Sequence, residues 1–157
     1  MIQRYSRPEM RAIWTEENKL RIWLQIELLA SEALVKEGIV PKADFAKLKA
    51  GVEECLADTK ALVETAKELE KKLNHDVIAF TTAVAEKVND RASRWLHFGL
   101  TSSDVGDTAY AVQMAQSAEI LIADVKELRK VVARRANEHM LTPCIGRSHG
   151  IHAEPTT

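Results

Sequence analysis

The chain has 157 residues, of which 46% are hydrophobic and 29% are charged, and its net charge is −1. This composition is typical of a globular domain, and the interleaved basic and acidic residues exclude a basic face for nucleic acid. The apolar runs are too short to predict a membrane-spanning helix. The first ten residues lack the apolar core of a signal peptide, so a cytoplasmic protein with two reduced cysteines is expected.

Apolar residues recur at helical spacing through the first hundred residues, and no stretch has the sustained alternation of a strand. Ser6 and Glu9 have the spacing of a capping box at the start of a short helix. Thr15 is predicted to cap a longer helix, which ends at Gly38.

Three further helices are predicted in this part of the chain. The first covers residues 41–50 and is closed by Gly51. The second is a charged amphipathic helix over residues 53–73. The third covers residues 76–88, with Asn74 as its expected N-cap.

Residues 101–139 are predicted to form one long helix that begins at a capping box of Thr101 and Asp104. Its apolar residues are spaced alternately three and four apart, which is typical of a helix-bundle seam. The predicted fold is therefore all-α, with a small helical domain over residues 1–100 and the first long helix of a central multi-helix bundle within residues 101–157. Because the apolar surface is large, we expect self-association through it. The seam residues are Ala111, Met114, Ala118, Leu121, Val125, Leu128 and Val132.

Two polar segments directly precede predicted helices: "NHDV" at 74–77 and "HFGLTSSDV" at 97–105. The free N–H groups and the partial positive charge of a helix N-terminus suit an anionic ligand group. These segments are therefore candidate binding sites for a carboxylate or a phosphate. The alternative is that their polar side chains only cap the helices.

A third polar segment, "GRSHGIHAEPTT" at 146–157, is predicted to be a glycine-containing loop. Arg147 could hold a carboxylate through two hydrogen bonds, and His149 could transfer a proton near neutral pH. A zinc site of Cys144, His149 and His152 is an alternative, but it lacks the second close pair of ligands found in structural zinc sites. A solvated loop is the other alternative, and His139 is expected to interact only with the end of the long helix.

Four segments in this order closely resemble the adenylosuccinate lyases of the fumarase/aspartase superfamily, and the resemblance covers the full chain: "RYSRPEM", "NHDVIAFT", "HFGLTSSDVGDTA" and "GRSHGIHAEPTT". The resemblance implies a β-elimination that splits a C–N bond without a metal or an organic cofactor. Adenylosuccinate would give AMP and fumarate, and the succinyl-carboxamide ribotide of purine biosynthesis would also release fumarate. It further implies a homotetramer whose sites are shared between subunits.

The same resemblance implies roles for individual residues. His149 corresponds to the general acid, and His75 to a residue that assists it. Asn74 and Asp76, beside His75, are implied to contact the substrate. Thr101 and Ser102 are implied to hold a succinyl carboxylate. Arg4 and Tyr5 are implied to contact the nucleotide phosphate, with His97 as a further candidate.

In the lyases that this sequence resembles, the catalytic base is a serine on a mobile loop that lies beyond the part matched here. The resemblance therefore implies that these 157 residues are an N-terminal piece, inactive by itself. Two alternatives stay open. One is another lyase of the superfamily, such as an argininosuccinate lyase. The other is a non-catalytic helical module that assembles through its long helix.

Overall fold

The computed structural model describes residues 2–157, except for the side chain of Gln3. It divides into two compact units, which we call unit 1 (residues up to Ser117) and unit 2 (Ala118–Thr157). The described residues contain no helix that is both long and apolar enough to cross a membrane. Because one helix contributes residues to both units, the boundary near residue 100 stays a prediction.

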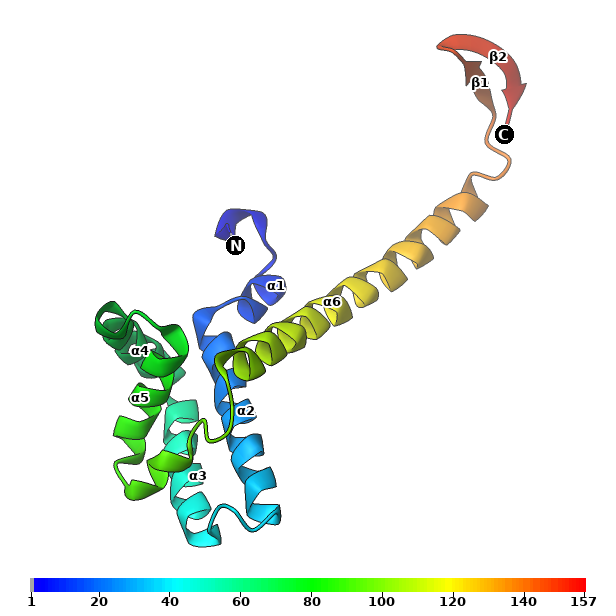
Figure 1. Cartoon of the computed structure of the whole chain (residues 1–157). Coiled ribbons are helices and arrows are strands. Elements are labelled where there is room, and N and C mark those ends of the chain that lie inside the picture. The colour runs from blue at the N-terminus through cyan, green and yellow to red at the C-terminus, as the bar shows by residue number, and fades with distance from the viewer. Residues whose placement is uncertain (1) are drawn as a thin grey trace. The chain divides into compact units, whose positions relative to one another are not determined.

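Within residues 2–157, the regular secondary structure is helical apart from one small hairpin, which confirms the all-α prediction. Figure 1 labels the α-helices and the strands. In chain order the elements are η1 (Gln3–Tyr5), α1 (Pro8–Ile13), α2 (Glu16–Lys36), α3 (Lys42–Ala57), α4 (Thr59–Leu73), α5 (Asp76–Val88), η2 (Arg91–Trp95), α6 (Ser102–Glu138), β1 (Cys144–Ser148) and β2 (Ile151–Thr156).

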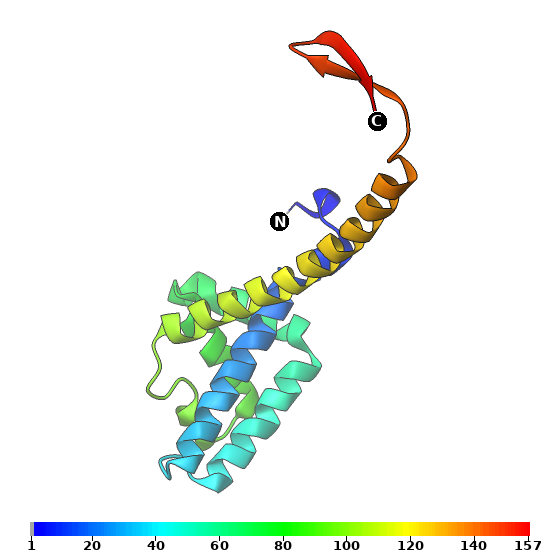
Figure 2. The ribbon, with the colours of Figure 1, turned by 90° about the vertical axis from the view of Figure 1, so that its right-hand side faces the viewer.

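Unit 1 is built around a hydrophobic core to which α2, α3, α4 and α5 all contribute. Figure 2 shows α2 and α3 side by side from a second direction. The indole of Trp23 packs edge-on against the ring of Phe80, with centroids 5.2 Å apart. The largest fully buried apolar side chains of these four helices are Leu24, Leu48, Val52, Phe80 and Val84.

The two ends of α2 confirm the sequence prediction, whereas the start of α1 does not. The Thr15 hydroxyl accepts the N–H of Asn18 at 3.2 Å, and Gly38 has a left-handed φ of 74° just after the helix. Helix α1 has Arg7 as its N-cap rather than Ser6. The reason is Pro8, whose fixed φ suits the first helical position, so the helix begins one residue later than predicted.

Gly51 does not end a helix, as the sequence had suggested, but lies inside α3. A Cβ atom at Gly51 would lie 2.6 Å from Cγ2 of Val88, so the glycine allows α3 and α5 to pack closely. The break comes later, at Asp58, whose carboxylate accepts the N–H of Ala61 at 3.0 Å. The predicted single helix over residues 53–73 is therefore the end of α3 followed by α4.

Asn74 is not the N-cap of α5, so this prediction is also wrong. It ends α4 with a left-handed φ of 51°, and its N–H donates to the carbonyl of Glu70 at 2.8 Å. Asparagine tolerates this conformation better than most residues, which explains its place between two helices. The N-cap of α5 is His75.

The predicted long helix is confirmed as α6. The N–H of Thr101 donates to the Asp104 carboxylate at 2.8 Å, which is one of the two hydrogen bonds of a capping box. Within unit 1, the early turns of α6 are tied to the junction between α1 and α2. Gln113 donates to the carbonyl of Ile13 at 2.8 Å, and the indole of Trp14 donates to Ser117 at 3.1 Å.

The segment predicted to be a loop forms the antiparallel hairpin of unit 2. Its two-residue turn consists of His149 and Gly150, with left-handed φ values of 51° and 77°. Two consecutive left-handed residues are typical of a type I′ turn, which matches the twist of the strands that it joins. Ser148 pairs with Ile151 beside the turn.

Candidate functional site

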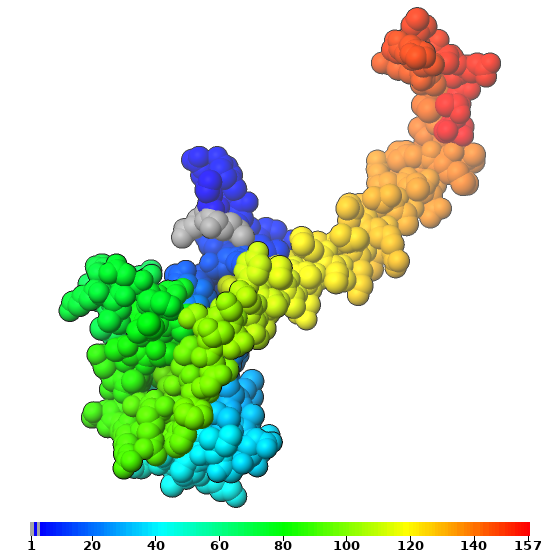
Figure 3. Space-filling view, in the orientation of Figure 1, coloured from blue at the N-terminus to red at the C-terminus, as the bar shows by residue number. Residues whose placement is uncertain are grey.

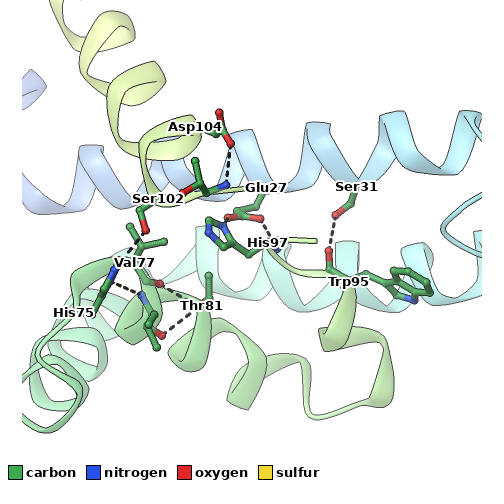
Figure 4. Close-up of polar contacts among 11 residues, drawn as sticks. Glu27, Ser31, His75, Val77, Thr81, Trp95, His97, Ser102 and Asp104 are labelled. Carbon is green, nitrogen blue, oxygen red and sulfur yellow. Dashed lines mark hydrogen bonds and ion pairs between the residues drawn. The ribbon is translucent and has the colours of Figure 1, made fainter. Parts of the chain in front are cut away.

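His75 is held at the start of α5 by both of its ring nitrogens (Figure 4). Its Nδ1 accepts the N–H of Ile78 at 3.4 Å, and its Nε2 lies 3.5 Å from Oγ of Ser102. The histidine therefore caps one helix and reaches the first residue of another. The fold thus brings together two residues that lie 27 positions apart and that the sequence singled out separately.

The neighbours of His75 on either side are exposed. The Asp76 carboxylate accepts its neighbour Val77's N–H at 2.8 Å and lies 3.6 Å from Nδ1 of His75. Asn74 follows the last turn of α4. Asn74 and Asp76 are therefore adjacent to His75, although their hydrogen bonds are those of helix ends.

Ser102 is the first residue of α6 and Thr101 directly precedes it, so the N-terminus of this helix lies beside Nε2 of His75. The hydroxyl of Ser102 is half-buried and that of Thr101 belongs to an exposed residue. Two hydroxyls, a histidine and a helix N-terminus form a cluster of hydrogen-bond donors. Such a cluster can bind a carboxylate or a phosphate.

His97 lies in the connection before α6 and contacts a buried acid, Glu27 of α2. One carboxylate oxygen accepts the backbone N–H of His97 and the other lies against Nδ1, both at 2.7 Å. Glu27 is 1% exposed. No role for Glu27 was predicted from the sequence. The signal that could have found it is an acid on the apolar face of a helix, which is rare without a partner.

Arg4 and Tyr5 lie in the N-terminal segment, which is drawn in blue at the surface of unit 1 in Figure 3. The guanidinium of Arg4 stacks over the ring of Tyr5, with its central carbon 4.7 Å from the ring centroid. Both residues are exposed. Within residues 2–157, no hydrogen bond or ion pair joins Arg4 or Tyr5 to His75 or Ser102.

His149 lies in unit 2, at the tip of the hairpin, with its side chain exposed. Arg147 pairs across the sheet with His152, and the register has an irregularity between Ile145 and Arg147. The hairpin therefore carries His149 in its two-residue turn, with the imidazole exposed. The other residues to which the resemblance assigns a role all belong to unit 1.

The alternative zinc site has no support from the geometry. Residues 2–157 contain no group of three or more histidine, cysteine, aspartate or glutamate side chains that could hold a metal ion. Cys144 opens β1 and is exposed, whereas Cys55 is buried in the core of unit 1, where burial raises the pKa of its thiol. Neither cysteine forms a disulfide.

Comparisons with known proteins give a consistent result. The profile of a protein family described as "Lyase" matches residues 3–157. The chain is 44% identical over all 157 residues to the adenylosuccinate lyase of Bacillus subtilis, and 46% identical to that of Streptococcus mutans. It spans about a third of the length of these curated relatives, 35% and 34% respectively.

Solved structures share the fold. A fumarate lyase from Mesorhizobium superposes with a TM-score of 0.82 at 23% identity, over 93% of this chain and 33% of that one. The 3-carboxy-cis,cis-muconate lactonizing enzyme from Pseudomonas putida gives a TM-score of 0.81 at 27% identity, over 96% of this chain and 34% of its own. These matches confirm the predicted fumarase/aspartase-like architecture.

Proposed function

The chain belongs to the lyase family, and on that premise we propose that it is the N-terminal part of an adenylosuccinate lyase. The observation that carries the proposal is the identity of 44% and 46% to adenylosuccinate lyases of two bacteria, over every residue of this chain. The reaction would be the elimination of fumarate from adenylosuccinate, with AMP as the other product. The related succinyl-carboxamide ribotide of purine biosynthesis would be the second substrate, and the cytoplasm the place of both reactions.

The proposed elimination needs a base and an acid. A base removes a proton from the carbon beside a carboxylate, the C–N bond breaks, and an acid protonates the departing nitrogen. We assign the acid to His149, which corresponds to the general acid of the lyases that the chain resembles, and histidine is a residue type suited to proton transfer near neutral pH. Its position on a hairpin turn, with an exposed imidazole, is compatible with approach to a substrate.

His75 and Ser102 are proposed to bind the succinyl part of the substrate. Their side chains are 3.5 Å apart, at a place where α5 and α6 both begin. A carboxylate there would receive hydrogen bonds from the hydroxyls of Thr101 and Ser102 and from free backbone N–H groups. Asn74 and Asp76 flank this position, and we propose that they orient His75.

Arg4 and Tyr5 are proposed to contact the phosphate of the nucleotide, with His97 as a further contact. A guanidinium is well suited to a phosphate because it can donate two parallel hydrogen bonds. Arg4 is exposed and stacked on Tyr5, so its charge is available to a ligand. No metal or organic cofactor has a part in this proposal.

Self-association through α6 is the second part of the proposal, with a homotetramer as the expected assembly. The part of α6 in unit 2 carries apolar side chains that are each about half exposed or more. Burying them against other helices would stabilise an assembly, because each Leu, Ile or Val contributes roughly 1.5–3 kcal/mol on burial. The residues concerned are Leu121, Ile122, Val125, Leu128, Val131 and Val132.

The proposal is tested by measuring fumarate release by the gene product that contains these 157 residues. Adenylosuccinate, the succinyl-carboxamide ribotide and argininosuccinate are offered separately. We expect release from the first two and none from argininosuccinate. The 157 residues alone are expected to be inactive, since the relatives that carry the name are about three times as long. Release from argininosuccinate alone would identify a different lyase of the superfamily.

A further inference from the structure

Both oxygens of the buried Glu27 carboxylate contact one residue, His97. Its Oε2 accepts the backbone N–H of His97 at 2.7 Å, and its Oε1 lies 2.7 Å from Nδ1 of the same residue. Figure 4 shows the two side chains pointing toward one another. Burying a carboxylate is costly unless it is hydrogen-bonded and paired, so this arrangement is a strong constraint on both residues.

The contact fixes the position of the proton on the imidazole. A carboxylate can only accept a hydrogen bond, so the nitrogen that faces it must be the donor. Nδ1 of His97 therefore carries a proton, and Nε2 is the nitrogen whose protonation can change. Within residues 2–157, Nε2 of His97 has no hydrogen-bond partner, and its side chain is 24% exposed.

The same contact fixes the backbone. His97 has a left-handed φ of 59°, which is uncommon for a residue other than glycine. The hydrogen bond from its N–H to Glu27 holds it there, four residues before Thr101. Glu27 thus controls both the ring and the course of the chain that leads into the start of α6.

We propose that Glu27 is a positioning residue, which holds His97 with its proton on Nδ1 and leaves Nε2 free for a ligand. When the ring is protonated, Nε2 would donate a hydrogen bond to an anionic group of the substrate, and this part of the inference rests on the proposed function. The placement of the proton on Nδ1 does not rest on it. It follows from two distances of 2.7 Å and from the burial of Glu27.

The test uses the 157-residue chain labelled with ¹⁵N in its histidine rings. Long-range proton–nitrogen spectra are recorded at about pH 8.5, where imidazoles with an ordinary pKa are neutral. The variant His97→Gln assigns the signals of His97 by their disappearance. In the native chain we expect His97 to show the pattern of a proton on Nδ1. His75 should show the opposite pattern, because its Nδ1 accepts the N–H of Ile78.

Glu27→Gln is the informative substitution, because it replaces one of the two acceptor oxygens with an NH2 group, which cannot accept an N–H. We expect His97 to lose the Nδ1-protonated pattern in this variant, while His75 keeps its own. The matched control is Ser31→Ala, one turn later on α2, which removes a buried hydroxyl whose Oγ donates to the Trp95 carbonyl at 3.4 Å. This control should leave the tautomer of His97 unchanged.

Two results would overturn the inference. One is a native His97 whose proton is on Nε2, a result that stands even where the Glu27 variant does not fold. The other is an unchanged Nδ1-protonated pattern in Glu27→Gln. A native Nδ1-protonated pattern in a gene product without lyase activity would contradict only the proposed function, so the two failures are distinguishable.

Discussion

Nε2 of His75 lies 3.5 Å from Oγ of Ser102, while Nδ1 of the same ring accepts the N–H of Ile78 at 3.4 Å. One imidazole therefore caps α5 and reaches the start of α6. Because Nδ1 accepts a hydrogen bond, the neutral ring carries its proton on Nε2, directed toward Ser102. A residue at this position has a structural task and a proposed binding task at once.

The two tasks of His75 can be separated by substitution. His75→Asn should keep the cap, since asparagine is a preferred N-cap, whereas His75→Ala should lose it. We expect the alanine variant to be less stable than the asparagine variant by about 1 kcal/mol in free energy of unfolding, measured with urea. Both variants should lose fumarate release in the gene product. Full activity in the asparagine variant would mean that His75 is only a cap.

Gly51 and Gly106 both lie within helices, yet the same substitution should have opposite effects on stability. A Cβ at Gly51 would lie 2.6 Å from a Val88 side-chain atom and 2.9 Å from its Cα, whereas a Cβ at Gly106 meets nothing within 4 Å. Gly51→Ala should destabilise the chain by about 1–3 kcal/mol through overpacking. Gly106→Ala should stabilise it by about 0.5–1 kcal/mol, because alanine is the better helix former. Equal shifts in thermal unfolding would contradict the packing of α3 on α5.

The behaviour of Gly51 illustrates what the sequence could not reveal. A glycine after an apolar periodic segment is a common helix end, and only the neighbouring helix shows that it serves close packing. The long helix was predictable, because its apolar spacing is sustained over many turns. The hairpin was not, because its strands are short and the left-handed turn begins with histidine rather than the usual asparagine.

The candidate site was predictable as a set of segments but not as a geometry. "NHDV" and "HFGLTSSDV" each contain polar residues before a helix, and each could be explained by capping alone. Their contact through His75 and Ser102 depends on how α5 and α6 pack, which local patterns do not contain. Glu27 was missed for the same reason, since its partner lies 70 residues away.

The ion pair of Lys47 and Asp90 should make part of the stability depend on pH. The hydrogen bond from Lys47, at 2.9 Å, and that from the Ala92 N–H hold the pKa of Asp90 below its ordinary value. The contribution of this ion pair to stability is therefore complete above about pH 5 and is lost as the pH falls through the lower pKa of the folded state. The same bond raises the pKa of Lys47, so its contribution is lost only at strongly alkaline pH.

Lys47→Met measures this effect. The difference in urea midpoint from the native chain should be constant between about pH 5 and 8 and should shrink toward pH 2. It should be small throughout, because both partners are partly exposed. Lys60→Met, which removes the same charge at an exposed position of α4, is the control. A difference that does not change with pH would show that Asp90 is not stabilised by Lys47.

The apolar face of α6 in unit 2 should cause self-association at micromolar concentration. Sedimentation of the 157-residue chain should show a dimer or a tetramer. Val125→Glu, which places a charge among exposed apolar residues, should shift the distribution toward monomer. Asn137→Glu adds the same charge outside the seam and should leave the distribution unchanged. A monomeric native chain would contradict the proposed assembly.

The central claim is that this chain supplies the general acid of an adenylosuccinate lyase, and one comparison of two histidine variants tests it most directly. His149→Gln and His139→Gln are made in the gene product, and the kcat for fumarate release from adenylosuccinate is measured. His139 follows the end of α6, with its Nδ1 3.1 Å from the Thr142 hydroxyl, and has no proposed role. We expect kcat to fall by about 10²–10⁴-fold or more for His149→Gln and to be nearly unchanged for His139→Gln. Equal losses in both variants, or a His149→Gln variant with native kcat, would contradict the claim.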